Sequence, residues 1–258
     1  MTEEERQKLY TVRWHVRERW GDENSKRDVL EMLAGLLEPD STPDHRPSVS
    51  SSGQRLLSCP FAENDFRPAV SRGNYAKGYP KGAVVHFTAG RRNGLASAMN
   101  YQVEQGYLYF VIDKDGNIGQ NFSLDSWGYH AGQSSYPGLS GKVSDDLVGI
   151  EVQCAGKLTK EGETDKTWFG TEVDTGEVRH ISEKTENQQE GDYERYTEAQ
   201  EDALTRLVLW LYKNNPDVFN LDFVVGHDEV SPDRKNDPGG ALSMTMPQYR
   251  EFLKRQAG

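Results

Sequence analysis

Short apolar runs alternate with amphipathic segments from residue 61 to the C-terminus. The apolar runs predict β-strands over residues 83–87, 107–113, 118–122, 147–154 and 223–226. Apolar positions at helical spacing predict helices over residues 95–105, 197–214 and 246–256. Thr197 and Gln200 stand at the positions of a capping box, which marks the start of the second helix. This alternation predicts an α/β (α+β) fold, in which helices flank a mixed central β-sheet.

Composition divides the chain into an appendage, a linker and one large domain. Apolar residues at helical spacing predict two helices within residues 1–38, which form a small N-terminal helical appendage. Residues 39–58 are rich in Pro, Ser and Asp, as is typical of a linker. Residues 59–258 form the main domain. Within it, residues 156–196 are acidic and hydrophilic, and we interpret them as an exposed insertion that forms an extended hairpin or lid.

The bulk composition is that of a soluble globular protein, with 35% hydrophobic and 28% charged residues. No apolar run approaches the roughly 20 residues of a membrane span, so integral membrane association is not expected. The net charge of −11 argues against nonspecific nucleic-acid binding, because it provides no broad basic surface. The two cysteines are too few for a disulfide scaffold. We expect Cys154 to be buried, and we do not favour a bridge between Cys59 and Cys154.

Two histidines and one aspartate form a candidate metal site. His86 and His227 each end an apolar run, and Asp237 follows in a loop bounded by Pro and Gly. Two imidazoles and a carboxylate suit a tetrahedral zinc ion with one open position, which is what a hydrolytic site requires. Either histidine alone would more often be an unrelated polar residue at a strand end. The hypothesis therefore depends on the combination.

Two further charged residues fit this chemistry. Glu151 interrupts the apolar run 147–154, and a buried carboxylate is costly unless it is paired or has a function. We interpret Glu151 as a general base whose pKa is raised by burial, with a structural ion pair as the alternative. Lys235 precedes Asp237 by two residues and would place its ammonium beside an oxyanion. A solvent-facing lysine is the alternative for that residue.

Aromatic residues near a third histidine predict a substrate-binding surface. Trp127 and His130 lie in one loop, a combination that suits sugar or peptide binding. A cluster that seals the edge of the domain is the alternative. Tyr107 and Tyr109 lie on one predicted strand and share a face by alternation, so either one could hydrogen-bond a substrate.

The segments that contain these residues resemble the type-2 N-acetylmuramoyl-L-alanine amidases. That family includes phage endolysins, a cytosolic muropeptide-recycling amidase and the animal peptidoglycan recognition proteins. The resemblance covers about residues 80–255 and is carried by segments 84–90, 109–116, 127–132, 148–151 and 226–239. The last segment is the most specific, because the spacing of its His, Lys and Asp residues matches the family motif.

The resemblance implies a zinc amidase fold with the metal in a surface groove. It also implies hydrolysis of the amide between N-acetylmuramic acid and the L-alanine of peptidoglycan. By position, it implies His86, His227 and Asp237 as ligands of one zinc ion. It implies Glu151 as the catalytic carboxylate and Lys235 as the cation that stabilises the intermediate.

This sequence departs from the family pattern at several positions. Phe87 stands where a second, non-ligand histidine is common, so the metal site should survive. Tyr109 also replaces a common histidine, and Gly128-Tyr129 is inserted before His130, which leaves the substrate contacts open. The acidic insertion is unusual and would narrow the choice of substrate.

Several functions remain open at this point. We expect a cell-wall-degrading enzyme, either a phage lysin or an antibacterial effector that causes bacteriolysis. A cytosolic amidase that recycles soluble muropeptides is the alternative. A non-catalytic peptidoglycan-recognition module is disfavoured, because binding alone does not need an open metal position. The appendage is expected to pack or to dock a partner, and a membrane-active helix is the less favoured alternative.

The expected location follows from the start of the chain. Residues 1–6 are acidic and no apolar core follows them, so no secretory signal peptide is predicted. We therefore expect synthesis in the cytoplasm. A lysin or effector would reach the periplasmic or extracellular wall through a holin or a secretion machine, whereas a recycling enzyme would stay in the cytoplasm.

Overall fold

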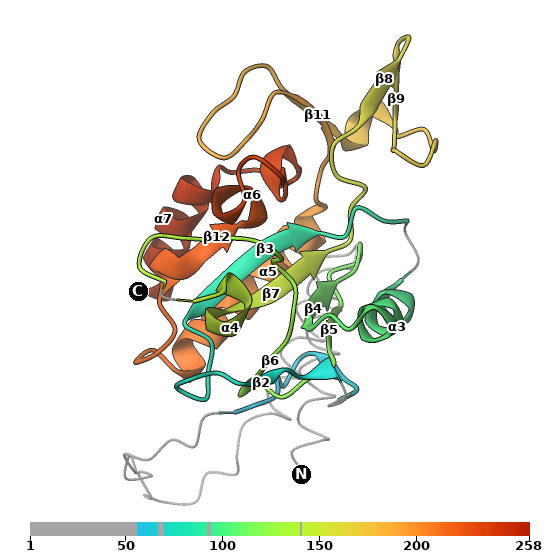
Figure 1. Cartoon of the computed structure of the whole chain (residues 1–258). Coiled ribbons are helices and arrows are strands. Elements are labelled where there is room, and N and C mark those ends of the chain that lie inside the picture. Colours follow the sequence, from blue (N-terminus) through green and yellow to red (C-terminus); the bar gives the residue numbers. More distant parts are fainter. Residues whose placement is uncertain (1–55, 67–69, 92–93, 140) are drawn as a thin grey trace, which may run out of the picture. The chain divides into compact units, whose positions relative to one another are not determined.

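A computed structural model describes residues 56–66, 70–91, 94–139 and 141–258, which belong to one compact unit (Figure 1). The predicted appendage and residues 39–55 of the predicted linker lie outside the described residues. From Leu56 onward the chain is bound to the domain. The Leu56 N–H donates to the Asn214 side chain at 3.0 Å, and the Leu57 carbonyl accepts from the Gln120 side chain at 3.1 Å.

A six-stranded sheet forms the centre, in the order β1-β5-β4-β7-β3-β12 (Figure 1). Its strands are β1 (Glu63–Asn64), β3 (Gly82–Phe87), β4 (Tyr109–Ile112), β5 (Ile118–Gln120), β7 (Leu147–Val152) and β12 (Val224–Gly226). Strands β4, β7, β3 and β12 run parallel, and β5 is antiparallel to β4. The predicted mixed sheet is confirmed. The parallel pairing places the carboxyl ends of β7, β3 and β12 side by side.

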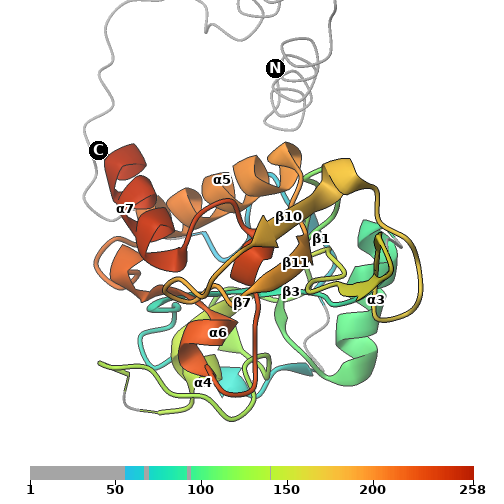
Figure 2. The ribbon, with the colours of Figure 1, turned by 90° about the horizontal axis from the view of Figure 1, so that it is seen from above.

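One face of the sheet is apolar and is covered by two helices, α5 (Glu198–Asn214) and α7 (Met246–Ala257). Ala83 and Val85 alternate onto this face of β3 and are fully buried. Leu204 and Leu207 of α5 belong to the same core cluster. Figure 2 shows both helices on this side of β3 and β7, with α4 and α6 on the other side.

The opposite face carries the polar residues. Val84 and His86 alternate onto it from β3, and register places Gly149 and Glu151 of β7 beside them. Three helices border this face: α3 (Leu95–Gln105), α4 (Val143–Asp146) and α6 (His227–Val230). The sheet therefore has a structural face and a face available for chemistry.

The helices match their sequence signals closely. Thr197 and Gln200 form the predicted capping box of α5. Helix α3 ends at Gly106, whose φ of 69° lies in the left-handed region that glycine adopts without strain. Strands β4, β5 and β7 end earlier than predicted. The Asp113 side chain closes the turn after β4, and the Gln153 carbonyl leaves the ladder of β7 to accept from Gln200 at 2.8 Å.

The insertion at residues 156–196 differs from the exposed hairpin or lid that the sequence predicts. It forms two hairpins, β8 (Thr159–Glu161) with β9 (Thr164–Lys166), and β10 (Val178–Ile181) with β11 (Gly191–Glu194), linked through the 3-10 turn η2 (Thr175–Glu177). Tyr193 of β11 is fully buried and packs on Gly239 and Gly240. The prediction of exposure is wrong for this second hairpin, because its aromatic side chain belongs to the domain interior.

Short elements complete the described chain. Strands β2 (Gly73–Asn74) and β6 (Ser126–Trp127) pair with each other, and the 3-10 turns are η3 (Leu221–Phe223) and η4 (Gly239–Ala241). Cys59 and Cys154 are both buried and free, which confirms the predicted burial of Cys154. Within the described residues, no helix combines the length and hydropathy needed to traverse a bilayer.

Candidate metal centre

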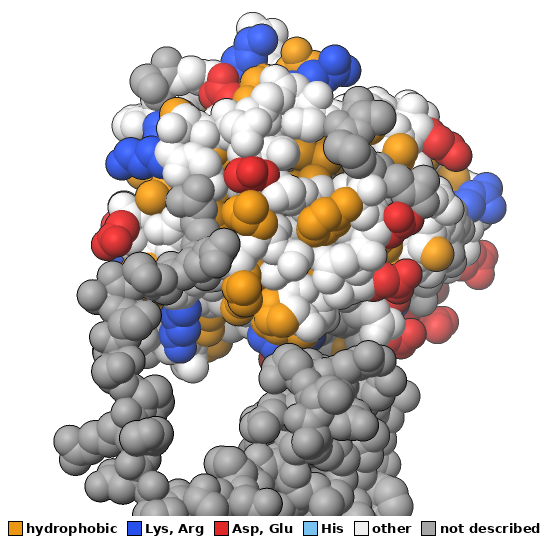
Figure 3. Space-filling view, turned by 90° about the horizontal axis from the view of Figure 1, so that it is seen from below, with side chains coloured by type: hydrophobic (Ala, Val, Ile, Leu, Met, Phe, Trp, Pro, Cys, Tyr) orange, Lys and Arg blue, Asp and Glu red, His pale blue; other side chains and the backbone are white. Residues whose placement is uncertain are grey.

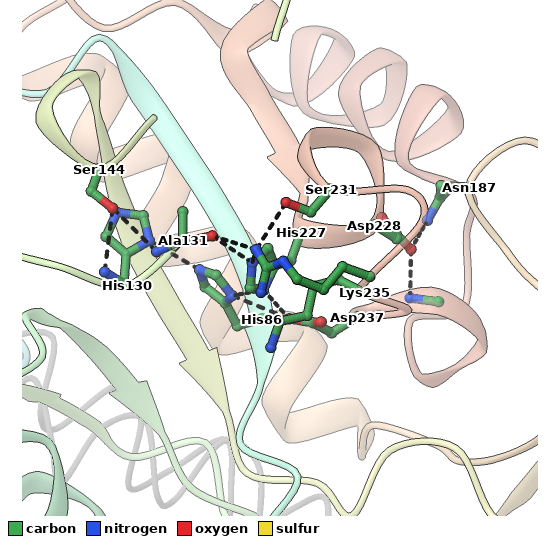
Figure 4. Close-up of polar contacts among 12 residues, drawn as sticks. His86, His130, Ala131, Ser144, Asn187, His227, Asp228, Ser231, Lys235 and Asp237 are labelled. Atoms are coloured by element: carbon green, nitrogen blue, oxygen red, sulfur yellow. Dashed lines mark hydrogen bonds and ion pairs between the residues drawn. The ribbon is translucent and has the colours of Figure 1, made fainter. Parts of the chain in front are cut away.

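The carboxyl ends of β3, β7 and β12 bring together polar residues that lie far apart in the sequence (Figure 4). His86, near the end of β3, pairs in register with Glu151 of β7. His227 directly follows β12 as the first residue of α6. The Asp228 N–H donates to the Asp237 carbonyl at 2.8 Å. This bond brings Asp237, at the end of the loop that follows α6, back beside the start of α6. Open α/β sheets position ligand sites at such carboxyl ends.

Three buried side chains point one atom each toward a common position. His86 Nδ1 lies 2.9 Å from His227 Nδ1 and 3.1 Å from Asp237 Oδ2. His227 Nδ1 lies 3.0 Å from the same carboxylate oxygen. Within the described residues, these three side chains form a group that could hold a metal ion. The predicted set of His86, His227 and Asp237 is therefore adjacent in space.

A chain of hydrogen bonds holds Nε2 of His86, the ring nitrogen that faces away from the common position. His130 Nε2 lies 2.9 Å from the Leu147 carbonyl, which can only accept, so this nitrogen carries the proton. His130 Nδ1 is then an acceptor, and it lies 3.1 Å from His86 Nε2, which must donate. His86 Nδ1 consequently presents a lone pair to the common position.

His227 is held in the same way. Its Nε2 lies 3.0 Å from the Ala131 carbonyl and donates to it, which leaves a lone pair on Nδ1. Two imidazole lone pairs and a carboxylate oxygen thus face each other within about 3 Å with no proton to share. A cation between these atoms would remove the repulsion among the three acceptors, so the group could hold a metal ion. Two nitrogens and one oxygen fit zinc with one free position, and the outer ring nitrogens are held by His130 in one case and by the Ala131 carbonyl in the other.

The protonation state of His86 agrees with this role. Burial, together with the neighbouring His227, lowers the pKa of His86 to about 4. The imidazole is therefore neutral at physiological pH. A neutral imidazole is the form that binds a metal.

Glu151 lies beside the acceptor set on the neighbouring strand. Its Oε2 atom is buried and has no hydrogen-bond partner among the described residues. Burial, and then the charge of Asp237, raise the pKa of Glu151 to about 8, although Lys235 opposes the shift. An unpaired carboxyl with a pKa near neutrality is suited to accept and return a proton.

Lys235 lies in the loop between α6 and Asp237 and is half-buried. Its backbone N–H donates to the Ser231 carbonyl at 2.9 Å, and its own carbonyl accepts from the Gln189 side chain at 3.4 Å. Figure 4 shows the Lys235 side chain beside His227 and Asp237. The positive charge of Lys235 lowers the pKa of both His86 and Glu151, so it acts on the cluster electrostatically.

A sequence comparison identifies the family of this chain. Residues 76–240 match the family described as N-acetylmuramoyl-L-alanine amidase. The chain belongs to this family. Two curated relatives, the 1,6-anhydro-N-acetylmuramyl-L-alanine amidases AmpD of Salmonella typhimurium strains SL1344 and LT2, are each 28% identical over 143 residues. The match covers 55% of this chain and 54% of each relative, so this amidase-family chain spans about half the length of these relatives.

Solved structures of amidases also resemble this chain. A selenomethionine derivative of AmpD is 21% identical with a TM-score of 0.48, over 76% of this chain and 96% of that one. AmiD from E. coli, in complex with anhydro-N-acetylmuramic acid-L-Ala-D-γ-Glu-L-Lys, is 19% identical with a TM-score of 0.47, over 71% and 61% of the two chains. Membership of the amidase family rests on the sequence match.

His130 has a different place in this amidase-family domain from the one that its sequence context predicts. Both of its ring nitrogens are engaged inside the protein, which leaves none to hydrogen-bond a substrate. Ser144 Oγ fixes the His130 loop by accepting from the Ala131 N–H at 3.1 Å. Gly149 leaves room for the ring, because a Cβ there would lie 2.8 Å from His130 Cγ. His130 is therefore a positioning residue for His86.

The other predicted substrate contacts are three aromatic residues: Trp127 of β6, Tyr107, which pairs with Tyr129 through a β-bridge, and Tyr109 at the start of β4. The Tyr107 and Tyr109 rings are 6.3 Å apart, with Tyr107 exposed and Tyr109 buried. Trp127 is half-buried, 5.8 Å from the ring of Tyr129, and Arg72 lies 5.1 Å from the same ring. Figure 3 shows one face of the domain on which hydrophobic side chains gather near the centre, with acidic side chains along one edge.

A polar contact between the insertion and α6 has no signal in the sequence. Asp228 Oδ2 accepts from Asn187 Nδ2 at 2.8 Å and from the Gly239 N–H at 3.1 Å. Burial raises the pKa of Asp228 to about 8. Asn187 lies within the acidic insertion and carried no recognisable signal, because its partner is 41 residues away. The insertion is therefore joined to the loop that carries Lys235 and Asp237.

Proposed function

We propose that this protein is a zinc-dependent N-acetylmuramoyl-L-alanine amidase, which hydrolyses the amide between N-acetylmuramic acid and L-alanine. The decisive observation is the cluster of three acceptor atoms, from His86, His227 and Asp237, beside the unpartnered carboxyl of Glu151. Membership of the amidase family supports the same bond as the target. Peptidoglycan or a muropeptide is accordingly the proposed substrate.

The reaction would use the residues in defined roles. A zinc ion held by the three acceptors would supply Lewis acidity and leave a fourth position free for the reacting groups. Glu151 would accept the proton of the attacking water at its buried Oε2 atom. The same carboxyl would return that proton to the amine of L-alanine as the C–N bond breaks, since a pKa near neutrality allows both steps. Lys235 would offset the negative charge that develops on the carbonyl oxygen.

The form of the substrate separates two candidates. The large insertion at residues 156–196 is more than a minimal housekeeping enzyme needs, which favours action on polymeric wall, as a phage lysin or an antibacterial effector that reaches the wall through a holin or a secretion machine. The names of the AmpD relatives specify a 1,6-anhydro-N-acetylmuramyl-L-alanine amide, which favours a muropeptide-recycling enzyme of the cytoplasm as the second candidate. A purely binding module would need neither Glu151 nor Lys235, so we place it below both.

Mass spectrometry of products tests the proposal directly. Purified sacculi and soluble muropeptides are each incubated with zinc-loaded protein, chelator-treated protein and the Glu151→Gln variant. Free stem peptides in the zinc-loaded reaction alone would support the proposal. Release from sacculi favours the lysin or effector, and release from soluble muropeptides alone favours the recycling enzyme. Binding of either substrate without any release would contradict an amidase and leave the recognition module.

A further inference from the structure

Trp168 combines the highest exposure among the large hydrophobic residues of the described chain with a fixed position. About two thirds of its surface is open to solvent, at 69%. Its indole Nε1–H nevertheless donates to the Ala89 carbonyl at 2.6 Å. A large aromatic ring that is anchored by its polar atom leaves its apolar face free to stack on a ligand.

The turn that carries Trp168 is itself well ordered. The Thr167 N–H donates to the Thr171 carbonyl at 2.8 Å, and the Thr171 N–H donates to Thr167 Oγ1 at 2.9 Å. The ring of Phe169 lies edge-on to the indole at 5.3 Å, and Arg91 lies 5.2 Å from the Phe169 ring centroid. The indole is thus held in one orientation before any ligand arrives, which lowers the entropic cost of binding.

The anchor places this ring close to the metal centre. Ala89 follows His86 by three residues, so their Cα atoms are at most about 11 Å apart, given a spacing of about 3.8 Å per residue. Ala89 also has a φ of 48°, in the left-handed region that alanine rarely occupies. Strained backbone of this kind concentrates at functional sites. The exposed indole therefore lies within the reach of a short oligosaccharide chain from the acceptor cluster.

We propose that residues 167–171 form a saccharide-binding subsite, in which the face of Trp168 stacks on a pyranose ring of the glycan chain. The C–H face of a pyranose is apolar and weakly positive, which complements the negative face of an indole ring. The orientation of the chain, with a muramic acid at the metal centre, rests on the proposed function. Sugar binding by Trp168 does not depend on catalysis.

This subsite would select for substrate length. A stem peptide linked to one sugar would reach the metal centre but leave Trp168 uncovered. A longer glycan would engage both positions and gain affinity from the second. The insertion would thereby favour peptidoglycan chains over small muropeptides.

Isothermal titration calorimetry of the full-length protein with chitotriose, a trimer of β-1,4-linked N-acetylglucosamine, tests the subsite alone. We expect Trp168→Ala to weaken binding roughly tenfold, which corresponds to about 1.4 kcal/mol. Phe66→Ala, at another exposed aromatic residue, serves as the matched control and should bind like the wild type. No binding by the wild type, or equal loss in both variants, would overturn the proposal.

A second variant separates stacking from anchoring. Trp168→Phe keeps an aromatic face but loses the indole N–H that bonds Ala89, so its loss of affinity should be smaller than that of Trp168→Ala. Equal losses in the two variants would show that Trp168 acts only as an anchor and would overturn the stacking. In hydrolysis of soluble peptidoglycan chains, Trp168→Ala should raise KM while kcat is retained. If the wild type hydrolyses nothing, the proposed function fails, while the calorimetry still decides the subsite.

Discussion

His86 donates its outer N–H to Nδ1 of His130 across 3.1 Å, so a metal-facing imidazole is oriented by a second imidazole that faces the protein interior. His130 in turn donates to the main chain of β7. This arrangement fixes which nitrogen of His86 carries a lone pair. Metal affinity should therefore depend on a residue that does not touch the metal position.

We expect His130→Ala to weaken zinc binding by about 10–100-fold, the usual cost of losing a partner that orients a ligand. Competition with a chromophoric chelator measures this affinity. His180→Ala is the control, because that side chain is 65% exposed on the insertion. Gly149→Ala should reproduce the loss, since its Cβ would displace His130. Unchanged affinity in both His130→Ala and Gly149→Ala would exclude the orienting role.

Removal of a direct ligand should have a larger effect. In Asp237→Ala and His227→Ala, we expect bound zinc and amidase activity to be lost together, because two remaining ligands hold zinc poorly. Metal analysis of the purified variants and product assays give the two readings. Chelation should lower the Tm of the wild type and leave the Tm of these variants unchanged, since a bound ligand stabilises only the state that binds it. Activity without zinc would refute the proposed cofactor.

Glu151→Gln should separate catalysis from metal binding. The amide keeps the size of the side chain but cannot accept a proton, so we expect kcat to fall by about 10²–10⁴-fold with the zinc content unchanged. Glu161→Gln, on the exposed β8–β9 hairpin, is the matched control and should keep full activity. A near-normal kcat for Glu151→Gln would remove this residue from the mechanism.

The second hairpin of the insertion should contribute to the stability of the domain. The buried Gln188 side chain donates to the carbonyls of Gly239, Leu242 and Met244, at 3.2, 3.4 and 3.3 Å. We expect Gln188→Ala to lower the free energy of unfolding by about 1–3 kcal/mol, because buried acceptors would lose their donor. Urea denaturation measures the change, and Glu190→Ala on the surface of the same loop is the control. Equal midpoints for the two variants would show that the contact is not stabilising.

Truncation should show where the domain begins. Deletion of residues 1–53 removes none of the described contacts, so the Tm of the domain should be retained. Deletion of residues 1–58 also removes the Leu56 contacts to Asn214 and the Leu57 contact to Gln120, and should lower the Tm. Calorimetry of both truncated proteins distinguishes these outcomes. A large loss in the shorter deletion would move the boundary toward the N-terminus.

The parts of this domain that sequence patterns predict well are those encoded locally. The capping box of Thr197 and Gln200 lies within four residues and marks the start of α5 correctly. The proposed ligands were recognisable because each histidine ends an apolar strand, and parallel pairing brings such ends together. Local chemistry and sheet geometry were sufficient for these assignments.

The parts that were missed depend on partners distant in the sequence. His130 looked like a substrate contact, because nothing in its own loop reveals that His86 and Leu147 occupy both of its nitrogens. The acidic composition of the insertion suggested exposure. The burial of Tyr193 and Gln188 depends instead on η4, about fifty residues later in the chain. Composition describes the average residue of a segment. It does not identify the few residues, such as Tyr193 and Gln188, that pack the segment against the rest of the domain.

Two main-chain carbonyls fix the tautomers of the histidines at the candidate metal centre. The Leu147 carbonyl accepts from His130, and the Ala131 carbonyl accepts from His227. A peptide carbonyl is present whatever side chain the position carries. Leu147 and Ala131 could therefore be replaced by other residues of suitable size without removing the carbonyls that set the histidine tautomers. Selection on metal binding would then act on the shape of the backbone at these two positions, and their side chains could diverge while the zinc chemistry persists.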